Sequence, residues 1–486
     1  MDRGVDGSRG VVAAGHRLTA EAGADVLRDG GTALDAAIAA IAMACACEPV
    51  LCSPGGTGFA MLRDGATGEI SLIDFFAQTP VASRQPDGVG VREVRADFGP
   101  AEQGFRVGPA SSATPGFFAG IEALHAAGAT RPLADLFAPA IGAARAGVRV
   151  SAFQHYLSTV VRPILMASQP SVDLFAPAGD VLREGELFRN PALADCLEVL
   201  AADGFAASDV GRACEAAQAR EGHLTAADFD AYEAVERRPL SMPVGESIVH
   251  MNPLPAASGT LIAHTLRHLR GHDAVGIAEA LRATGAARAV AAPDLSDLAA
   301  VTLRRRGTSH VSVIDASGTA CAVSVSNGEG NGELVDGFGF MLNNILGEED
   351  VNPAGADGWP VDTRLSSMMC PTMIESPDGG LVALGSGGSN RIRSAIAQVI
   401  VHLCLRDAGL GAAIDAPRLH VESGHLDFED LYDARVRDDL CRLFTDHRAW
   451  PEPNLFFGGV HAAAVDGDGG FIGCGDARRD GTSVLV

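Results

Sequence analysis

The sequence contains no lysine, so all 37 of its basic residues are arginine. Acidic residues number 61, which gives a formal net charge of −24 at pH 7. The longest run of basic residues is Arg304–Arg306. Because most of such a surface would repel a phosphate backbone, we expect no nucleic-acid partner.

Long apolar runs and metal-binding cysteine patterns are also missing. The most apolar stretch, residues 36–47, is too short to cross a bilayer, and residues 1–18 lack the apolar core of a signal peptide. The ten cysteines form no Cys-x-x-Cys pair, and those at 45, 47 and 52 lie in or beside the apolar stretch, where buried thiols are common. We therefore expect a cytoplasmic protein with no membrane partner, no metal and no cofactor.

Small side chains dominate what is present, with 58 glycines, 47% apolar residues and only 5% aromatics. This composition is globular, and the length suffices for one large domain or up to about three. Helical periodicity predicts two helices in residues 16–47, the first capped by Thr19 and the second opened by Thr32 with Asp35. Further helical patterns occupy most of 116–235, 260–290 and 391–409, and strand patterns occupy 54–75, 237–252, 308–326, 337–345, 369–388 and 458–486. Helices before and after a central set of strands predict a layered α+β or αββα domain.

A Gly-Thr step, Gly307-Thr308, opens the strand pattern at residue 308. On pattern alone, Thr308 is a β-branched residue at the start of a strand. The alternative is that the Gly307–Thr308 bond is cut, which makes the Thr308 hydroxyl a nucleophile and its own α-amine the base. A free α-amine titrates near ~8, so a useful fraction of it is neutral at pH 7. Glycine at 307 leaves the preceding carbonyl open to attack.

The turn of the predicted hairpin, residues 315–318, determines which residues of the second strand lie opposite Thr308. With this turn, Ile314 faces Thr319, and counting outward brings Val325 and Ser326 beside Thr308. A serine hydroxyl at that position would orient the nucleophile.

Two other stretches are compatible with an anion site. Glycines in residues 384–392, LGSGGSNRI, lie between a predicted strand and a predicted helix, where free backbone N–H groups can hold an oxyanion. A plain tight turn has the same pattern. Arg364 with Ser366 and Ser367 would suit a carboxylate, and ordinary surface serines are the alternative.

Several motifs together resemble the γ-glutamyltransferase family of N-terminal nucleophile hydrolases, also called glutathione hydrolases. In order they are GVVAAGHRLTAEAGADVLRDGGTALDAAIAA, the EP at 48–49, PGGTGF, TPGFFAG, GTSHVSVIDASGTACAVSVS, GFGFMLNNILGEED, RLSSMMCPTMI, GSGGSNRI, DAPRLH and GDARRDGTS. The resemblance covers nearly the whole chain. It implies a four-layer αββα sandwich, made as a precursor and cut before Thr308 into a large subunit (residues 1–307) and a small subunit (residues 308–486). It further implies that Thr308 attacks a γ-glutamyl amide and passes the acyl group to water or to an amino acid acceptor.

The same resemblance assigns roles to other residues. Ser326 falls where the family keeps a second threonine that supports the nucleophile. Gly388 and Ser389 fall on the paired glycines of the family's oxyanion hole, where the donors are backbone amides. Ser366 and Ser367 match the serine pair that holds the α-carboxylate of the substrate.

The remaining substrate-binding positions include three departures from the family pattern. Glu348 falls on the aspartate that binds the substrate's α-amine, one methylene longer. Phe76 stands where the family's arginine clamps the α-carboxylate, and this removes a contact worth about 2–4 kcal/mol when buried. Gly328 replaces an expected asparagine, for which the adjacent Asn327 could substitute with a small shift. Ile345 replaces a polar residue.

Three hypotheses follow. The first is a γ-glutamyltransferase or glutathione hydrolase whose carboxylate clamp is rebuilt, with Arg364 or Arg391 as the replacement. The second is an acylase or amidohydrolase of the same family that acts on a non-glutamyl amide, such as a β-lactam side chain or a small oxo-acid amide, because Phe76 and Ile345 make the pocket more apolar. The third is an uncleaved binding protein with an inactive site.

Overall fold

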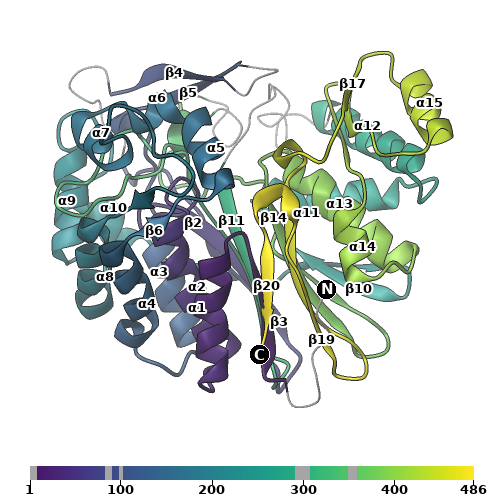
Figure 1. Ribbon diagram of the computed structural model, residues 1–486, viewed down its shortest axis with the longest axis horizontal. Coiled ribbons are helices and arrows are strands. Elements are labelled where there is room, and N and C mark those ends of the chain that lie inside the picture. Colours follow the sequence, from purple (N-terminus) through teal and green to yellow (C-terminus); the bar gives the residue numbers. More distant parts are fainter. Residues whose placement is uncertain (1–7, 83–89, 98–101, 291–306, 349–357) are drawn as a thin grey trace.

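The fold has four layers, with two β-sheets stacked face to face and helices on both outer faces (Figure 1). The computed structural model describes residues 8–82, 90–97, 102–290, 307–348 and 358–486. Strands β11 (Gly307–Asp315) and β14 (Leu381–Gly387) contact each other across the stack. The αββα architecture expected from the sequence is therefore confirmed. Arg304–Arg306 lie outside the described residues.

The larger sheet has seven strands in the order β20-β1-β11-β12-β2-β3-β8. Segments from before and after residue 308 are interleaved in it, because β1 lies between β20 and β11, and β12 pairs with β2. The other strands of this sheet are β1 (Gly10–Ala14), β2 (Thr57–Arg63), β3 (Ile70–Phe75), β8 (Val235–Arg237), β12 (Ala320–Gly328) and β20 (Thr482–Leu485). A cut before residue 308 would leave the two parts joined along four strand pairs, β1 with β11, β1 with β20, β2 with β12 and β10 (Ser247–Met251) with β13 (Thr372–Glu375), and by the shared core.

The second sheet has six strands in the order β19-β18-β14-β13-β10-β9. Besides β14 it contains β9 (Leu240–Val244), β10 (Ser247–Met251), β13 (Thr372–Glu375), β18 (Gly459–Val465) and β19 (Phe471–Cys474). Three small sheets lie apart from the stack: β4 (Arg92–Asp97) with β5 (Glu102–Val107), β6 (Val148–Arg149) with β7 (Leu187–Phe188), and β15 (Leu419–Glu422), β16 (His425–Glu429) and β17 (His447–Trp450).

The helices fall into two groups on opposite sides of the stack (Figure 1). On the seven-stranded side are α1 (Arg17–Arg28), α2 (Ala33–Cys47), α3 (Phe117–Ala126), α4 (Leu133–Ala146), α5 (Ala152–Val160), α6 (Arg162–Leu165), α7 (Gln169–Phe175), α8 (Pro191–Asp203), α9 (Asp209–Gln218) and α10 (Ala226–Ala231). On the other side are α11 (Ala257–Arg267), α12 (Ala274–Val290), α13 (Arg391–Leu405), α14 (Leu410–Asp415) and α15 (Ala434–Leu443). Helix α2 contacts both β11 and α4, and every residue of it is buried. Its alanine-rich sequence has no polar face because it lies between the sheet and the outer helices.

The predicted helix pair at residues 16–47 is confirmed as α1 and α2. Thr32 opens α2 with a capping box, in which the Thr32 hydroxyl accepts from the Asp35 amide and the Asp35 carboxylate accepts from the Thr32 amide. The prediction that Thr19 caps α1 is wrong. His16 is the N-cap, and its Nδ1 accepts from the Leu18 amide at 3.1 Å.

The strand predicted at residues 337–345 is also wrong, because these residues make only isolated bridges. Gly337 and Gly339 adopt positive φ values of 78° and 64°, which break an extended backbone. The Asn343 side chain then bonds to the carbonyls of Gly55 and Ala113 and fixes this segment as a loop.

The predicted hairpin exists, but its register differs by one residue. Ile314 faces Ala320 rather than Thr319, because the Asp315 amide donates to the Thr319 carbonyl and lengthens the turn. At the other end the ladder shifts between Gly307 and Ser309, with Thr308 at the irregularity.

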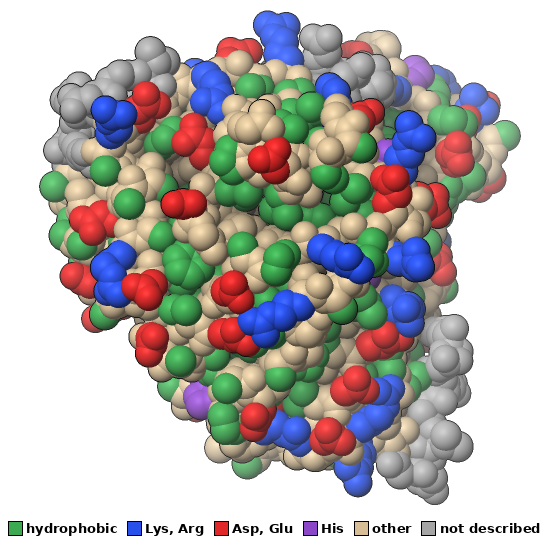
Figure 2. All heavy atoms as spheres, turned by 60° about the vertical axis from the view of Figure 1, so that its left-hand side comes forward, with side chains coloured by type: hydrophobic (Ala, Val, Ile, Leu, Met, Phe, Trp, Pro, Cys, Tyr) green, Lys and Arg blue, Asp and Glu red, His purple; other side chains and the backbone are tan. Residues whose placement is uncertain are grey.

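Acidic and basic side chains are interspersed with apolar ones on the face shown in Figure 2, and no broad area of that face is basic. Within the described ranges, no helix is long and apolar enough to cross a membrane. The same part of the chain contains no group of three or more His, Cys, Asp or Glu side chains that could hold a metal ion.

Candidate active site

The Gly307–Thr308 peptide lies at the start of β11, where it is buried between neighbouring groups. The Gly307 carbonyl oxygen accepts a hydrogen bond from Ser326 Oγ at 2.6 Å. The Gly307 amide donates to Glu329 Oε1 at 3.1 Å, and Gly307 pairs with Gly328 on β12. Thr308 itself is only 5% exposed. The carbonyl of the predicted cleavage junction is therefore held by Ser326, and the amide of the residue before the junction is held by Glu329.

Ser326 owes its position to the neighbouring strand as well as to the hairpin. It pairs with Thr57 on β2, and its Oγ also accepts from the Gly328 amide at 3.1 Å. Since that amide fixes one lone pair of the hydroxyl, the proton of the hydroxyl points to the Gly307 carbonyl. A hydroxyl in this arrangement polarises the carbonyl and stabilises negative charge that develops on its oxygen.

The glycine loop after β14 faces Thr308 from the second sheet. A Cβ on Gly387 would stand closer than 3.0 Å to the Thr308 carbonyl oxygen, so only glycine allows this approach. Gly388 has a φ of 130° and Ser389 a φ of 55°, the left-handed region that is strained for a serine. Helix α13 follows at once, and the amides of its first two residues, Arg391 and Ile392, donate to the carbonyls of Gly388 and Ser389. The structure therefore brings Gly387, the residue before Gly388 and Ser389, against the Thr308 carbonyl, and a glycine loop of this kind can hold an anion.

Glu348 also lies near the junction. A Cβ on Gly328 would meet both Asn344 Oδ1 and Glu348 Oε1 closer than 3.0 Å. Gly328 has a φ of 61°, and Asn344 Oδ1 accepts from the Glu329 amide at 3.0 Å. The side-chain volume that an asparagine at 328 would need is thus filled by Asn344 and Glu348.

Asn327 does not take over that position. Its Nδ2 donates to the Met341 carbonyl at 3.3 Å, and its side chain lines a small cavity with Cys45 and Cys52. As the residue after Ser326 in a regular strand, it faces the opposite side of β12.

Phe76 lies in the hydrophobic core directly after β3. Its ring stacks on Phe59, with ring centroids 5.3 Å apart, and it is 3% exposed. Ile345 and Leu365 belong to the same core cluster. The position at which the family's carboxylate clamp is expected is therefore apolar in this chain.

Arg364 does not supply a free guanidinium in its place. Its Nη1 donates to the Phe76 carbonyl at 2.5 Å and to the Tyr232 hydroxyl, and its Nη2 donates to the Glu233 carbonyl at 2.6 Å. Arg391 is likewise buried, donates from Nε to the Phe456 carbonyl at 3.1 Å and lies over the Phe456 ring. Both candidate replacements for the clamp are engaged with protein groups.

Ser366 and Ser367 follow a segment that bonds to the end of β3, since the Leu365 amide donates to the Ala77 carbonyl at 3.0 Å. Ser367 Oγ accepts from the Met369 amide at 3.1 Å. Ser366 Oγ is buried and, among the described residues, has no hydrogen-bond partner. The pair therefore follows the residue that is bonded next to Phe76, and within the described residues no hydrogen bond links the pair to Thr308.

Glu329 is a site residue that the sequence reasoning missed. Its carboxylate accepts from the amide of the residue before the junction, and it is 3% exposed. Its only sequence signal is an acidic residue in the glycine-rich segment that follows β12, which is too common to single out.

Polar groups also support the residues after Thr308. Ser309 Oγ donates to Glu48 Oε2 at 2.8 Å, and Thr19 Oγ1 donates to Glu48 Oε1 at 2.7 Å. Complete burial raises the pKa of the Glu48 carboxyl. His310 lies between the sheets against Ser324, and burial lowers its pKa well below the usual value, so it is neutral. These contacts fix the course of β11 on both of its faces.

Comparisons with known proteins agree with this geometry. A sequence model of the family described as gamma-glutamyltranspeptidase matches residues 19–291 and 277–486. The acylase ACY 1 proenzyme of Pseudomonas sp. (strain V22) is 30% identical over 534 residues, which cover 99% of this chain and 94% of the relative. The glutathione hydrolase proenzyme of Bacillus subtilis (strain 168) is 25% identical and covers 99% of this chain and 92% of the relative.

Among solved structures, cephalosporin acylase from Bacillus halodurans superposes with a TM-score of 0.83 at 21% identity, over 100% of this chain and 97% of that one. This match shows that the two proteins share a fold. With the family match across nearly the whole sequence, it leads to one conclusion: the chain is an enzyme that belongs to the gamma-glutamyltranspeptidase family.

Proposed function

We propose that the chain is a self-cleaving amide hydrolase in which Thr308 becomes the N-terminal nucleophile. The observation that carries this proposal is the short hydrogen bond from Ser326 Oγ to the Gly307 carbonyl, 2.6 Å long. It polarises the one carbonyl that an attack by the adjacent threonine would require. Related proteins named as proenzymes support a precursor.

Self-cleavage starts with attack of Thr308 Oγ1 on the Gly307 carbonyl carbon. The carbonyl oxygen becomes an oxyanion, which Ser326 stabilises, and the hydroxyl proton passes to the departing Thr308 nitrogen. The result is an ester between Gly307 and Thr308 Oγ1. Water then hydrolyses this ester and leaves a Gly307 carboxylate and a free Thr308 with its α-amine and hydroxyl. The products are residues 1–307 and 308–486, which remain together because their strands are interleaved.

In each turnover, the Thr308 α-amine removes the proton from the Thr308 hydroxyl as the oxygen attacks an amide carbonyl. The backbone amides of Gly388 and Ser389 hold the oxyanion, since this loop lies against Thr308. The amine product leaves, and the acyl-enzyme is released by water or by an amino acid acceptor. No metal or cofactor takes part in this scheme.

For the substrate, we propose an acyl amide that does not depend on a clamped α-carboxylate. Phe76 is stacked on Phe59 at the expected clamp position, and Arg364 is bonded to Phe76, Tyr232 and Glu233. A relative named as an acylase supports this choice. A γ-glutamyl amide is the second candidate, because Glu348 lies beside the junction and Ser366 Oγ lacks a partner among the described residues.

Gel electrophoresis and N-terminal sequencing test the nucleophile. Purified wild type should give two fragments, one of which begins at Thr308. Thr308→Ala should remain a single chain, and Thr308→Ser, which keeps a hydroxyl, should still be cut. A wild-type protein without Thr308 at an N-terminus would refute the proposal.

A substrate panel with the processed enzyme tests the specificity. Simple acyl anilides should be turned over faster than a γ-glutamyl anilide of the same leaving group. Faster turnover of the γ-glutamyl anilide would establish the second candidate instead.

A further inference from the structure

The side chain of Arg479 runs past Gly459 to the start of the glycine loop at Gly387 and Gly388. Its side chain crosses Gly459, where a Cβ would stand 2.7 Å from the Arg479 Cβ. Its guanidinium ends beside Gly387, the strand partner of Gly459, with Nη1 2.8 Å from the place of a Cβ there. Neither glycine has a positive φ, so space is what requires glycine here: Arg479 fills the space at Gly459, and Arg479 together with the Thr308 carbonyl fills it at Gly387.

The Thr308 carbonyl oxygen borders the same spot. It also lies closer than 3.0 Å to the place of a Cβ on Gly387. The guanidinium and the main chain of Thr308 therefore face each other across a residue that has no side chain. Arg479 Nη2 lies 3.5 Å from the corresponding point on Gly388, the next residue of the loop.

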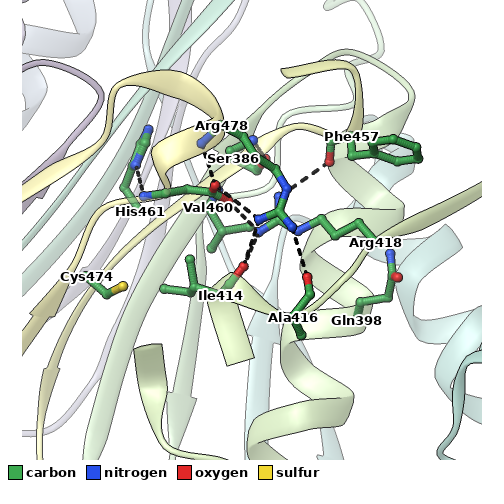
Figure 3. Close-up of polar contacts among 12 residues, drawn as sticks. Ser386, Gln398, Ile414, Ala416, Arg418, Phe457, Val460, His461, Cys474 and Arg478 are labelled. Atoms are coloured by element: carbon green, nitrogen blue, oxygen red, sulfur yellow. Dashed lines mark hydrogen bonds and ion pairs between the residues drawn. The ribbon is translucent and has the colours of Figure 1, made fainter. Parts of the chain in front are cut away.

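The nearest carboxylates are already occupied by other arginines. Arg418 Nη2 bonds to Asp476 Oδ2 at 2.5 Å, and Arg478 bonds to Glu429 through Nε at 2.7 Å and Nη2 at 2.6 Å. Figure 3 shows Arg418 and Arg478 converging, with dashed bonds to the main-chain carbonyls of Ile414, Ala416 and Phe457. Three buried arginines thus share two buried carboxylates, and Arg479 carries the excess positive charge.

Arg479 has no hydrogen-bond partner in the part of the chain that the structure describes, and Asp476, the carboxylate that acts on its charge, is bonded to Arg418 and Arg478. Arg479 Nε and Nη1 are buried without a hydrogen bond, and the residue is 5% exposed. Burial lowers the pKa of the guanidinium to about 10, so it remains protonated at neutral pH. A buried cation without a hydrogen-bond partner is costly, and such a group beside a glycine loop is a candidate functional residue.

Given the function proposed above, on which this step rests, we propose that Arg479 is a positioning residue for Thr308. Its charge stabilises the oxyanion that forms at the Gly388–Ser389 loop and keeps the α-amine of the processed Thr308 neutral, so that the amine can act as a base. Arg479 touches neither the substrate nor the reacting atoms and acts through the loop and through Thr308.

The charges around the α-amine of Thr308 determine whether its pKa is raised or lowered. A nearby positive charge disfavours the ammonium form and lowers the pKa of the amine. Glu329 and Glu348 lie beside the junction on the other side and act in the opposite sense. Glu48 lies one residue away through Ser309, and His310 is neutral. Arg479 is the cation that offsets these carboxylates from the second sheet.

The test is the pH dependence of kcat/KM for an acyl anilide, measured on holoenzymes whose small subunit is first shown by sequencing to begin at Thr308. Arg479→Met keeps the aliphatic stem over Gly459 and removes the charge. It should move the acid limb of the profile upward by about one pH unit and lower kcat about ten- to a hundredfold. Arg479→Lys, which keeps the positive charge, should leave the acid limb of the pH profile near its wild-type position. Arg442→Met, which removes an exposed arginine that pairs with Asp439, should change neither.

An unchanged acid limb and kcat in processed Arg479→Met would overturn the proposal. If Arg479→Met is not processed, the pH profile of kcat/KM of the wild-type enzyme tests the proposal instead. Its acid limb should lie below the ordinary range of an α-amine, about 7.7–8.0, and a limb within or above that range would overturn the proposal. A wild-type chain that lacks Thr308 at an N-terminus would instead refute the underlying function.

Discussion

Replacing Ser326 by alanine should slow cleavage of the Gly307–Thr308 bond while leaving the fold in place. The Ser326 hydroxyl is the donor to the Gly307 carbonyl, at 2.6 Å. In the attack by Thr308 this oxygen gains a full negative charge, so the hydrogen bond becomes stronger in the transition state than in the precursor.

The expected decrease in the rate of cleavage follows from the loss of one hydrogen-bond donor to the oxyanion. Removal of such a donor costs about 2.7–4 kcal/mol, which is about a hundred- to a thousandfold in rate. The substitution also leaves the Gly328 amide without the acceptor that lies 3.1 Å away, which lowers the free energy of unfolding by about 1–3 kcal/mol. The loss of stability changes the melting temperature but not the activation barrier of cleavage, so the loss of stability and the loss of rate can be measured separately.

Cell-free translation followed by a chase supplies the assay, because it reports the conversion of precursor to fragments from the moment of synthesis. Ser326→Ala should accumulate as precursor for at least a hundred times longer than the wild type. Ser326→Thr keeps a hydroxyl at the same position and should be cut at nearly the wild-type rate. If Ser326→Ala is processed as fast as Ser326→Thr, the hydroxyl does not stabilise the oxyanion and the reasoning fails.

Three other outcomes are expected. Glu329→Gln keeps an acceptor for the Gly307 amide, and its precursor should be cut at close to the wild-type rate, whereas Glu329→Ala should be cut about tenfold more slowly on a time-course gel. Gly385→Ala should lower the free energy of unfolding by about 1–3 kcal/mol in urea titrations, because its Cβ would collide with the His310 ring. Burial lowers the pKa of His461 to about 4, so the unfolded chain binds a proton that the folded chain does not between pH 6.5 and 4. The stability of the Thr308→Ala precursor should therefore fall as the pH drops through this range, by about 3 kcal/mol from this group, and His461→Gln should flatten that slope.

The layered fold was predictable because its signals are local. Thr32 and Asp35 form the capping box that their spacing indicates, and the apolar run at 36–47 is the buried helix α2. The hairpin at 307–328 was visible from its alternation. Its register was not, because the Asp315 to Thr319 hydrogen bond lengthens the turn and Thr308 sits at an irregularity of the ladder. Neither feature leaves a mark on the alternation of residues.

The site also contains residues that the sequence could predict and residues that it could not. Gly307, Thr308 and Ser326 lie in one hairpin, so their proximity follows from the sequence of that hairpin alone. Glu329 and Arg479 required the tertiary structure. Arg479 stands near the C-terminus in a motif quoted for its resemblance, yet its role depends on the glycines of β14 and β18, which lie up to 92 residues before it.

The proposed function requires two reactions of Thr308, and a different set of donors serves each. In the proposed scheme, the oxyanion of self-cleavage forms on the Gly307 carbonyl and is held by Ser326, a side chain of the seven-stranded sheet. The oxyanion of turnover forms on a substrate carbonyl and is held by backbone amides of the loop after β14, in the six-stranded sheet, with Arg479 behind it. Because Thr308 lies in β11 of the seven-stranded sheet, with its carbonyl oxygen against Gly387 of the six-stranded sheet, both sets of donors lie close to it. Substitutions at Ser326 should therefore affect processing more than turnover, and substitutions at Arg479 should do the reverse.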